Sequence, residues 1–223
     1  MSLDNSSPPQ SDLVARAKLL ATSTLANALD DVGLYFNVIP NIKAVSPGFR
    51  FAGPAVTVHE EVGDYGSFSS EDFKVGAMID SASPGDVIVV EAAGVAYSTW
   101  GGTASYAAKL KGIAGLMVNG GVRDLEEIID FEFPVFARHL IPTTGRTRLK
   151  VQAINVPVTF DGVHIEPGDI VVADGTGIVS LPHQRAAEII QLAEEFNRDD
   201  AAAIEDLKAG LTFSQAMAKY KKI

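Results

Sequence analysis

The feature of this sequence that most constrains its fold is an alternation of short apolar runs with helical stretches in the middle of the chain. A valine-rich run at residues 87–90 and a second apolar run at 113–118 have the length of buried strands. Residues 104–111 between them place alanines on one helical face, and a further helix at 125–131 leads into a strand that begins at Pro134. Strand–helix–strand units in this order predict an α/β domain with parallel strands.

The two ends of the chain differ from this centre. Residues 1–11 are rich in Ser, Pro and Asn and are expected to form a disordered lead, after which Asp12 can cap a first helix. The tail from Gln184 is again helical, and such a tail either packs on a neighbouring subunit or covers its own domain. We expect a lead at 1–11, a single α/β domain at 12–183 and a helical C-terminal extension at 184–223.

Composition narrows the kinds of function. The chain has 223 residues, no cysteine and 47% hydrophobic residues, which is the profile of a globular domain whose metal ligands can only be oxygen or imidazole. With 18 basic against 28 acidic residues its net charge is -10, which repels nucleic acid. No apolar run nears the roughly 20 residues of a membrane span, and the first residues lack a signal-peptide pattern. We therefore expect a cytoplasmic protein that binds neither nucleic acid nor membrane.

Candidate chemistry begins where Trp100-Gly101-Gly102-Thr103-Ala104 enters a helix. Glycines let a ligand approach the backbone closely, and the first N–H groups of a helix have no internal acceptors. This opening can therefore bind a carboxylate or a phosphate. A Gly-Gly pair before a helix is also a common tight turn, and that simpler interpretation stays open.

A second candidate follows the apolar run 113–118, where residues 119–122 are expected to form a flexible turn that leads to Arg123-Asp124. Ligands of open α/β sheets gather at the carboxyl ends of strands. Arg123 offers a planar fork for a carboxylate, and Asp124 offers a hard oxygen ligand for Mg²⁺ or Mn²⁺. The competing interpretation is that Asp124 caps the next helix and that Arg123 is a surface residue.

At these positions the chain resembles the RraA-like family, which contains 4-hydroxy-4-methyl-2-oxoglutarate aldolases, related oxaloacetate decarboxylases and regulators of ribonuclease E activity. The resemblance runs from about Leu19 to Pro182. It is carried by segments that share the family's order and spacing, at residues 23–30, 85–90, 101–104, 112–115, 119–124, 134–138 and 168–174.

The resemblance implies a swivelling ββα-type domain that assembles as a homotrimer or homohexamer, with sites between subunits. It also implies that the backbone at 101–104 and Arg123 hold the carboxylate of a short 2-oxo acid, while Asp124 binds a divalent cation, Mg²⁺ or Mn²⁺. Arg123 and Asp124 are then the expected catalytic residues. Such a metal stabilises the enolate that forms when a carbon–carbon bond beta to a ketone breaks, so that no lysine Schiff base is required.

Two departures from the family pattern bear on this metal. Family aldolases have an acidic residue where this chain has Gly102, and members commonly have an aspartate where it has Asn119. We expect both changes to remove negative charge from around the cation. Other carboxylates can compensate, and the candidates are Glu91, the residues Glu60, Glu61 and Asp64 of a loop expected after Val58, and Glu194 or Glu195 from a neighbouring subunit's tail.

Two functions of different class remain. One is a metal-dependent aldolase or decarboxylase, a lyase that forms pyruvate from a 2-oxo acid such as 4-hydroxy-4-methyl-2-oxoglutarate or oxaloacetate; the Arg123-Asp124 pair favours it. The other is a non-catalytic, protein-binding regulator of the ribonuclease E inhibitor type, which Gly102 favours. The sequence does not specify the substrate beyond its 2-oxo carboxylate.

Overall fold

The apolar runs form the centre of a mixed sheet that has ten strands within residues 8–220, the part of the chain that the computed structural model describes. The strands are β1 (Val38–Ile39), β2 (Lys43–Ala44), β3 (Phe51–Val62), β4 (Val87–Glu91), β5 (Ser98–Trp100), β6 (Gly115–Val122), β7 (Val135–Leu140), β8 (Leu149–Ile154), β9 (Val158–Phe160), β10 (Val163–Ile165), β11 (Ile170–Ala173) and β12 (Ile178–Leu181). The helices are α1 (Gln10–Ala17), α2 (Thr22–Asp31), the 3-10 turn η1 (Ser70–Asp72), α3 (Val75–Ser81), α4 (Gly102–Lys111), α5 (Leu125–Asp130), α6 (Ala186–Lys208) and α7 (Phe213–Lys219).

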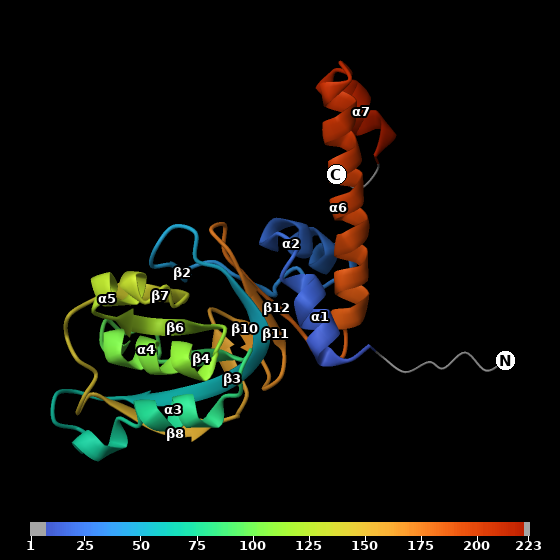
Figure 1. Cartoon of the computed structure of the whole chain (residues 1–223). Coiled ribbons are helices and arrows are strands. Elements are labelled where there is room, and N and C mark those ends of the chain that lie inside the picture. The colour runs from blue at the N-terminus through green and yellow to red at the C-terminus, as the bar shows by residue number, and fades with distance from the viewer. Residues whose placement is uncertain (1–7, 221–223) are drawn as a thin grey trace.

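The sheet runs in the order β1-β12-β11-β3-β4-β6-β7-β2, with β5 beside β6 and β8 beside β3. Neighbours among β3, β4, β6 and β7 are parallel, and the connections between them pass through α3, α4 and α5. These three helices lie together along one face of the parallel strands (Figure 1). The predicted α/β fold class, with its alternation of strand and helix, is confirmed.

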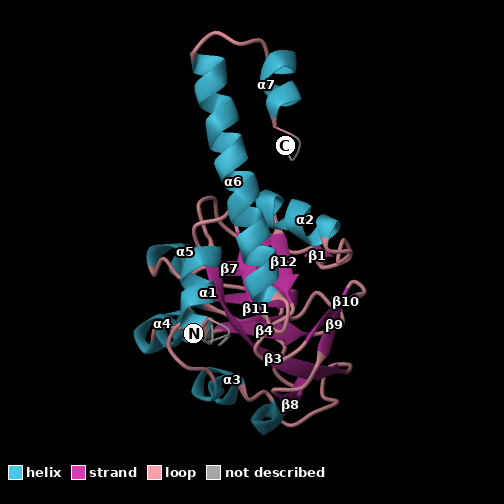
Figure 2. Cartoon of the chain, turned by 90° about the vertical axis from the view of Figure 1, so that its right-hand side faces the viewer, coloured by secondary structure: helices cyan, strands magenta, loops and turns pink. Residues whose placement is uncertain are grey.

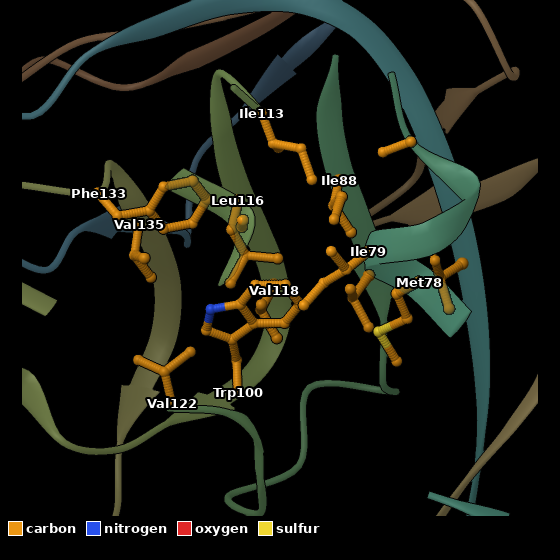
Figure 3. Packing of buried hydrophobic residues seen from close by; sticks show 14 of the residues in the cluster. Met78, Ile79, Ile88, Trp100, Ile113, Leu116, Val118, Val122, Phe133 and Val135 are labelled. Atoms are coloured by element: carbon orange, nitrogen blue, oxygen red, sulfur yellow. The ribbon is translucent and has the colours of Figure 1, made fainter. Parts of the chain in front are cut away.

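Successive residues of β4 enter different cores. Ile88 and Val90 face α3, α4 and α5, whereas Val87 and Val89 face the antiparallel hairpin β9–β10. Ile88 and Trp100 point into the helix-side core in Figure 3. Because both faces of these strands are buried, their sequence is continuously apolar rather than alternating. The layers are therefore helices, sheet and hairpin, which agrees with the ββα arrangement.

A third core joins the two ends of the chain. Helices α1, α2 and the first half of α6 pack on β11 and β12, and Arg16 of α1 donates to both carboxylate oxygens of Glu194 at 2.7 and 2.9 Å. The far half of α6 extends away from the α/β body, and α7 folds back beside it (Figures 1 and 2). The first half of the tail helix thus packs on its own domain, and the far half makes no part of that core. No helix within the described residues combines the length and apolarity that a bilayer crossing needs.

Three local predictions are corrected. Helix α1 begins at Gln10, after Pro9, so the end of the predicted lead is helical; residues 1–7 lie outside the described part. Residues 119–122 belong to β6 rather than to a flexible turn, because β5 and β7 pair with them on both sides. Glu60 and Glu61 lie in β3 rather than in a loop, since β8 pairs with that strand up to Val62.

Candidate functional site

Two helix starts meet at the Gly101-Gly102 pair. Trp100, just before it, is 2% exposed and fixed in the helix-side core (Figure 3), where its indole Nε1 donates to Ser105 Oγ at 2.9 Å. The backbone N–H of Arg123 donates to the carbonyl of Trp100 at 3.0 Å, which joins the end of β6 to the end of β5. The beginning of α4 and the segment that leads into α5 are therefore neighbours, although 22 positions separate Gly102 from Asp124.

Asp124 connects these two helices. It precedes α5 with a φ of 58°, a left-handed conformation that aspartate tolerates better than most residues and that is enriched at functional sites. Its side chain makes no cap hydrogen bond to α5; instead Oδ2 accepts from the N–H of Gly102 at 3.2 Å. Asp124 therefore occupies the N-cap position of α5, but its side chain does not cap that helix, because its carboxylate faces the start of α4.

Both glycines are required by space rather than by backbone conformation, since neither has a positive φ. A Cβ on Gly101 would overlap Asp124 Oδ2 and lie 3.3 Å from Arg123 Nε. A Cβ on Gly102 would overlap the carboxylate of Glu127 and lie 2.7 Å from its Cβ. The side chain of Glu127 on α5 thus occupies the space that a side chain at position 102 would need.

Glu127 has no counterpart among the sequence predictions. It follows Asp124 by three positions, and residues at that spacing lie on one face of a helix. The predicted helix at 125–131 therefore places Glu127 on the same face as Asp124. Only the packing of α5 against α4 shows that this face contacts Gly102.

A cavity of about 320 Å³ opens between these helix starts and α3. Gly101, Thr103, Ala104, Arg123 and Asp124 all line it, whereas Gly102 does not. The side chains of the Arg-Asp pair are 47% and 39% exposed, and Nε lies 3.5 Å from Oδ2. The rest of the wall is mostly apolar, formed by Phe73, Val75, Gly76, Ile79, Ser98, Thr99, Trp100, Ala107 and Thr144.

This arrangement can bind an anion and a cation side by side. The first-turn amides of Thr103 and Ala104 have no acceptor inside the helix, and Arg123 adds a guanidinium to the same wall. The hydrogen bond from Gly102 and the approach of Arg123 both involve Oδ2 of Asp124, and Glu127 is a second carboxylate beside α4. Nowhere in residues 8–220 do three or more His, Asp or Glu side chains form a metal cluster. The donors fit Mg²⁺, which proteins hold through one or two carboxylates together with water and substrate.

Asn119 belongs to a different network. Its Nδ2 donates to Glu91 Oε2 at 2.8 Å, and its Oδ1 accepts from Arg138 Nε at 2.7 Å. Arg138 also donates to Asp161 at 2.6 Å, which lowers the pKa of that carboxyl, while burial raises the pKa of Glu91. Asn119 does not line the cavity, so this geometry gives no support to the expectation that it removes charge from around the cation.

Within the single chain, three of the carboxylates proposed to compensate lie away from the cavity, and the contribution of Glu194 or Glu195 from a neighbouring subunit stays a prediction. Glu61 pairs with Lys150 at 3.5 Å, and Glu194 is engaged with Arg16 of its own chain. Glu60 is buried and accepts a hydrogen bond from Thr99. None of these three acidic residues lines the cavity.

Comparison with known proteins identifies the family of the chain. The RraA-like family model, described as Aldolase/RraA, matches residues 22–180. A Halalkalibacterium halodurans protein provisionally named 4-hydroxy-4-methyl-2-oxoglutarate aldolase is 31% identical over 192 residues, 86% of each chain. The crystal structure of an uncharacterised Pseudomonas syringae pv. tomato protein aligns with a TM-score of 0.87 and 30% identity, and the match covers 98% of this chain and 100% of that one.

A further similar structure is that of Streptomyces coelicolor RraAS2, described as an unusual member of the RNase ES inhibitor RraA protein family. It aligns with a TM-score of 0.77 and 28% identity over 90% of this chain and 98% of its own. Because the family model spans most of the chain, the conclusion is direct: this protein belongs to the RraA-like family.

Proposed function

We propose that this protein is a divalent-metal-dependent carbon–carbon lyase that converts a short 2-oxo acid, such as 4-hydroxy-4-methyl-2-oxoglutarate or oxaloacetate, to pyruvate. The observation that carries the proposal is the meeting of Arg123, Asp124 and the start of α4 at one cavity. The similarity to a provisionally named aldolase supports the same substrate class.

In this proposal the substrate carboxylate binds to Arg123 and to the amides of Thr103 and Ala104. A guanidinium fork and a helix N-terminus both favour such an anion. A cavity of about 320 Å³ suits a small acid, and its apolar wall keeps water from the remainder of the ligand. Positioning therefore comes from groups that the fold holds in place before substrate arrives.

Asp124 would hold the cation, with water and substrate as its other ligands; Glu127 lies beside Gly102 and does not line the cavity. When bound, the cation supplies a Lewis acid next to the 2-oxo group. Cleavage of the bond beta to the ketone leaves an electron pair on the pyruvate fragment as an enolate. Arg123 and the positive end of α4 lie beside that developing charge, and such preorganised groups lower a barrier by several kcal/mol.

The proposal includes assembly as a homotrimer or homohexamer with sites between subunits. The far half of the tail supports contact between copies, because Ile204 and Phe213 are 52% and 67% exposed there. Light scattering coupled to size exclusion should give three or six chains per particle. A monomer that retains full activity would contradict this part.

The test is release of pyruvate from oxaloacetate and from 4-hydroxy-4-methyl-2-oxoglutarate, with Mg²⁺ and with a chelator. Oxaloacetate also loses CO₂ spontaneously, so Asp124→Asn protein at the same Mg²⁺ concentration is the matched blank. We expect product only with wild-type protein and metal. Inactivity with every metal and 2-oxo acid tested would exclude the lyase.

The second candidate is a non-catalytic regulator of ribonuclease E type, supported by the similarity to Streptomyces coelicolor RraAS2. Inhibition of a ribonuclease E preparation by this protein would be measured on a labelled RNA. We expect none. Inhibition that Asp124→Asn protein retains in full, together with absent lyase activity, would favour the regulator.

A further inference from the structure

Glu60 is a buried carboxyl group that the proposed mechanism does not yet use. It lies in β3 at a register shift against β8 and is 1% exposed. Oε1 accepts a hydrogen bond from the Thr99 hydroxyl at 2.6 Å, whereas Oε2 is buried and has no hydrogen-bond partner in the described part of the chain. Burying a carboxylate with one oxygen unsatisfied is costly, so the position favours the neutral acid.

Thr99 links this group to the cavity. It precedes Trp100 in β5 and belongs to the cavity wall. Arg123 and Asp124 are the only titratable side chains among the residues that line that cavity in the described structure. The guanidinium stays protonated and Asp124 would face the cation, so neither is suited to deliver a proton to carbon.

Bond cleavage creates a need for such a proton, because the enolate becomes pyruvate only when its C3 carbon is protonated. We propose that Glu60, acting through the Thr99 hydroxyl, is the proton source for C3 of the enolate. This inference rests on the proposed function and adds to it the residue that completes turnover.

The step balances without another reactant. Glu60 in its acid form donates to Thr99 Oγ1, and Thr99 passes its own hydroxyl proton to C3. The electron pair of the enolate double bond forms the new C–H bond, and the ketone is restored. Glu60 is left as a carboxylate, and Thr99 donates to it as in the observed contact. After pyruvate leaves, water in the cavity returns the proton to Glu60 through the Thr99 hydroxyl. A hydroxyl can serve both ends of this exchange because it donates and accepts.

The ionisation of Glu60 suits this task. Burial raises its pKa to about 7, and the hydrogen bond from Thr99 opposes that shift. The charged or titratable groups on the paired strands are His59, Glu61, Glu91 and Lys150. Glu61 pairs with Lys150, whereas Glu91, whose pKa burial also raises, accepts a hydrogen bond from Asn119 and does not line the cavity. Asp80, on α3, is exposed. The pH response is assigned to Glu60 because its carboxyl group is the one hydrogen-bonded to Thr99 of the cavity wall.

The experiment is hydrogen–deuterium exchange at the pyruvate methyl group in D₂O, followed by NMR with Mg²⁺-loaded protein between pH 5 and 9. Exchange runs the step backwards, with the Glu60 carboxylate as base, so its rate should rise with pH and level off above about 7. General acid–base groups contribute about 10²- to 10⁴-fold. Glu60→Gln should thus lower exchange at least about 100-fold, while pyruvate affinity stays within about twofold.

Two further variants and one control separate chemistry from folding. Thr99→Val should lose exchange as Glu60→Gln does, and Thr99→Ser should keep it. Glu61→Gln, one position along β3 and half-exposed, should change neither rate nor pH profile. Because the pKa of Glu60 is raised to about 7 in the folded protein, the folded state loses stability as the pH rises from the ordinary glutamate pKa to about 7. The melting temperature of Glu60→Gln should therefore exceed that of wild type at pH 8 and equal it at pH 5.

Wild-type exchange rate and pH profile in Glu60→Gln or in Thr99→Val would overturn the inference. If wild-type protein exchanges pyruvate protons in a Glu60-dependent way but cleaves no 2-oxo acid, the proposed lyase fails and the proton path stands. If the Glu60→Gln protein cleaves substrate at the wild-type rate, the lyase stands and the proton path fails. A wild-type protein that neither exchanges nor cleaves overturns both.

Discussion

Two polar clusters lie at the carboxyl end of β6, and they differ in how completely their charges are paired. In the strand network, Glu91, Asn119, Arg138 and Asp161 form a continuous chain of hydrogen bonds of 2.6 to 2.8 Å. In the helix-start cluster, Asp124 accepts one bond of 3.2 Å from Gly102, and its nearest approach to the adjacent guanidinium is 3.5 Å. Only the second cluster lines the 320 Å³ cavity.

The difference separates structure from function among residues that look alike in sequence. A satisfied network fixes strands in place and has little left to offer a ligand. The helix-start cluster keeps donors and an acceptor directed at an open space, at the cost of a left-handed Asp124. Substitutions in the helix-start cluster should therefore change chemistry, and those in the strand network should change stability.

The largest effect is expected for Asp124→Asn. The amide keeps the size of the side chain but loses the charge for the cation, and loss of one such electrostatic group costs about 10²- to 10³-fold in rate. Steady-state pyruvate formation measures it. Asp130→Asn, exposed at the end of the same helix, is the matched control and should behave as wild type. An equal loss of pyruvate formation in both variants would show that the activity depends on the integrity of α5 and not on the Asp124 carboxylate.

Arg123→Ala should weaken oxalate and pyruvate binding roughly 10- to 100-fold, since a hydrogen bond to a charged group is worth about 1.5–3 kcal/mol. Titration calorimetry with oxalate gives the affinity. Arg123→Lys should recover only part of it, because an ammonium cannot match the planar fork. Unchanged affinity in Arg123→Ala would remove this residue from the site.

Gly102→Ala should destabilise the fold by about 1–3 kcal/mol, since its methyl group must displace Glu127 and overpacking of this kind is costly. The matched control is Gly76→Ala in α3, where a Cβ meets nothing within 4 Å. That change should stabilise by about 0.5–1 kcal/mol. Urea unfolding measures both, and the same sign for the two variants would contradict the packing of α4 against α5.

Asn119→Asp should have the smallest effect on turnover, within about threefold, because the residue lies outside the cavity. It would place a carboxylate against Glu91, whose pKa burial already raises. Two facing carboxylates repel when both are ionised, so the loss of stability should grow from pH 5 to pH 8. Thermal melts across that range test this, and a large loss of turnover at unchanged stability would return Asn119 to the site.

The central α/β pattern was readable from sequence because it is local. The valine run of β4, the alanine face of α4 and Gly112 with its φ of 80° each follow from short-range periodicity or backbone preference. The prediction of a flexible turn at 119–122 is wrong because glycines, considered without their neighbours in space, indicate flexibility. In the structure, Gly121 instead allows close approach: a Cβ there would lie 2.5 Å from Ile141.

Only part of the candidate site could be predicted from the sequence, because the rest depends on contacts between distant segments. Arg123 and Asp124 could be proposed from their place after a strand, and the α4 opening from its glycines. Glu127, Asn119 and Glu60 could not be assigned, because each depends on which element packs against it. Sequence spacing gives no distance between α4 and α5, and none between β3 and β5.

The account depends most on the claim that Asp124, Arg123 and the start of α4 together hold a cation and a small carboxylate. A crystal structure with Mn²⁺ and oxalate, with anomalous scattering used to locate the metal, tests it most directly. We expect a manganese peak about 2.2 Å from an Asp124 carboxylate oxygen, with oxalate against Arg123 and the amides of α4. Manganese and oxalate bound elsewhere, or a cavity that stays empty at saturating concentrations, would contradict it.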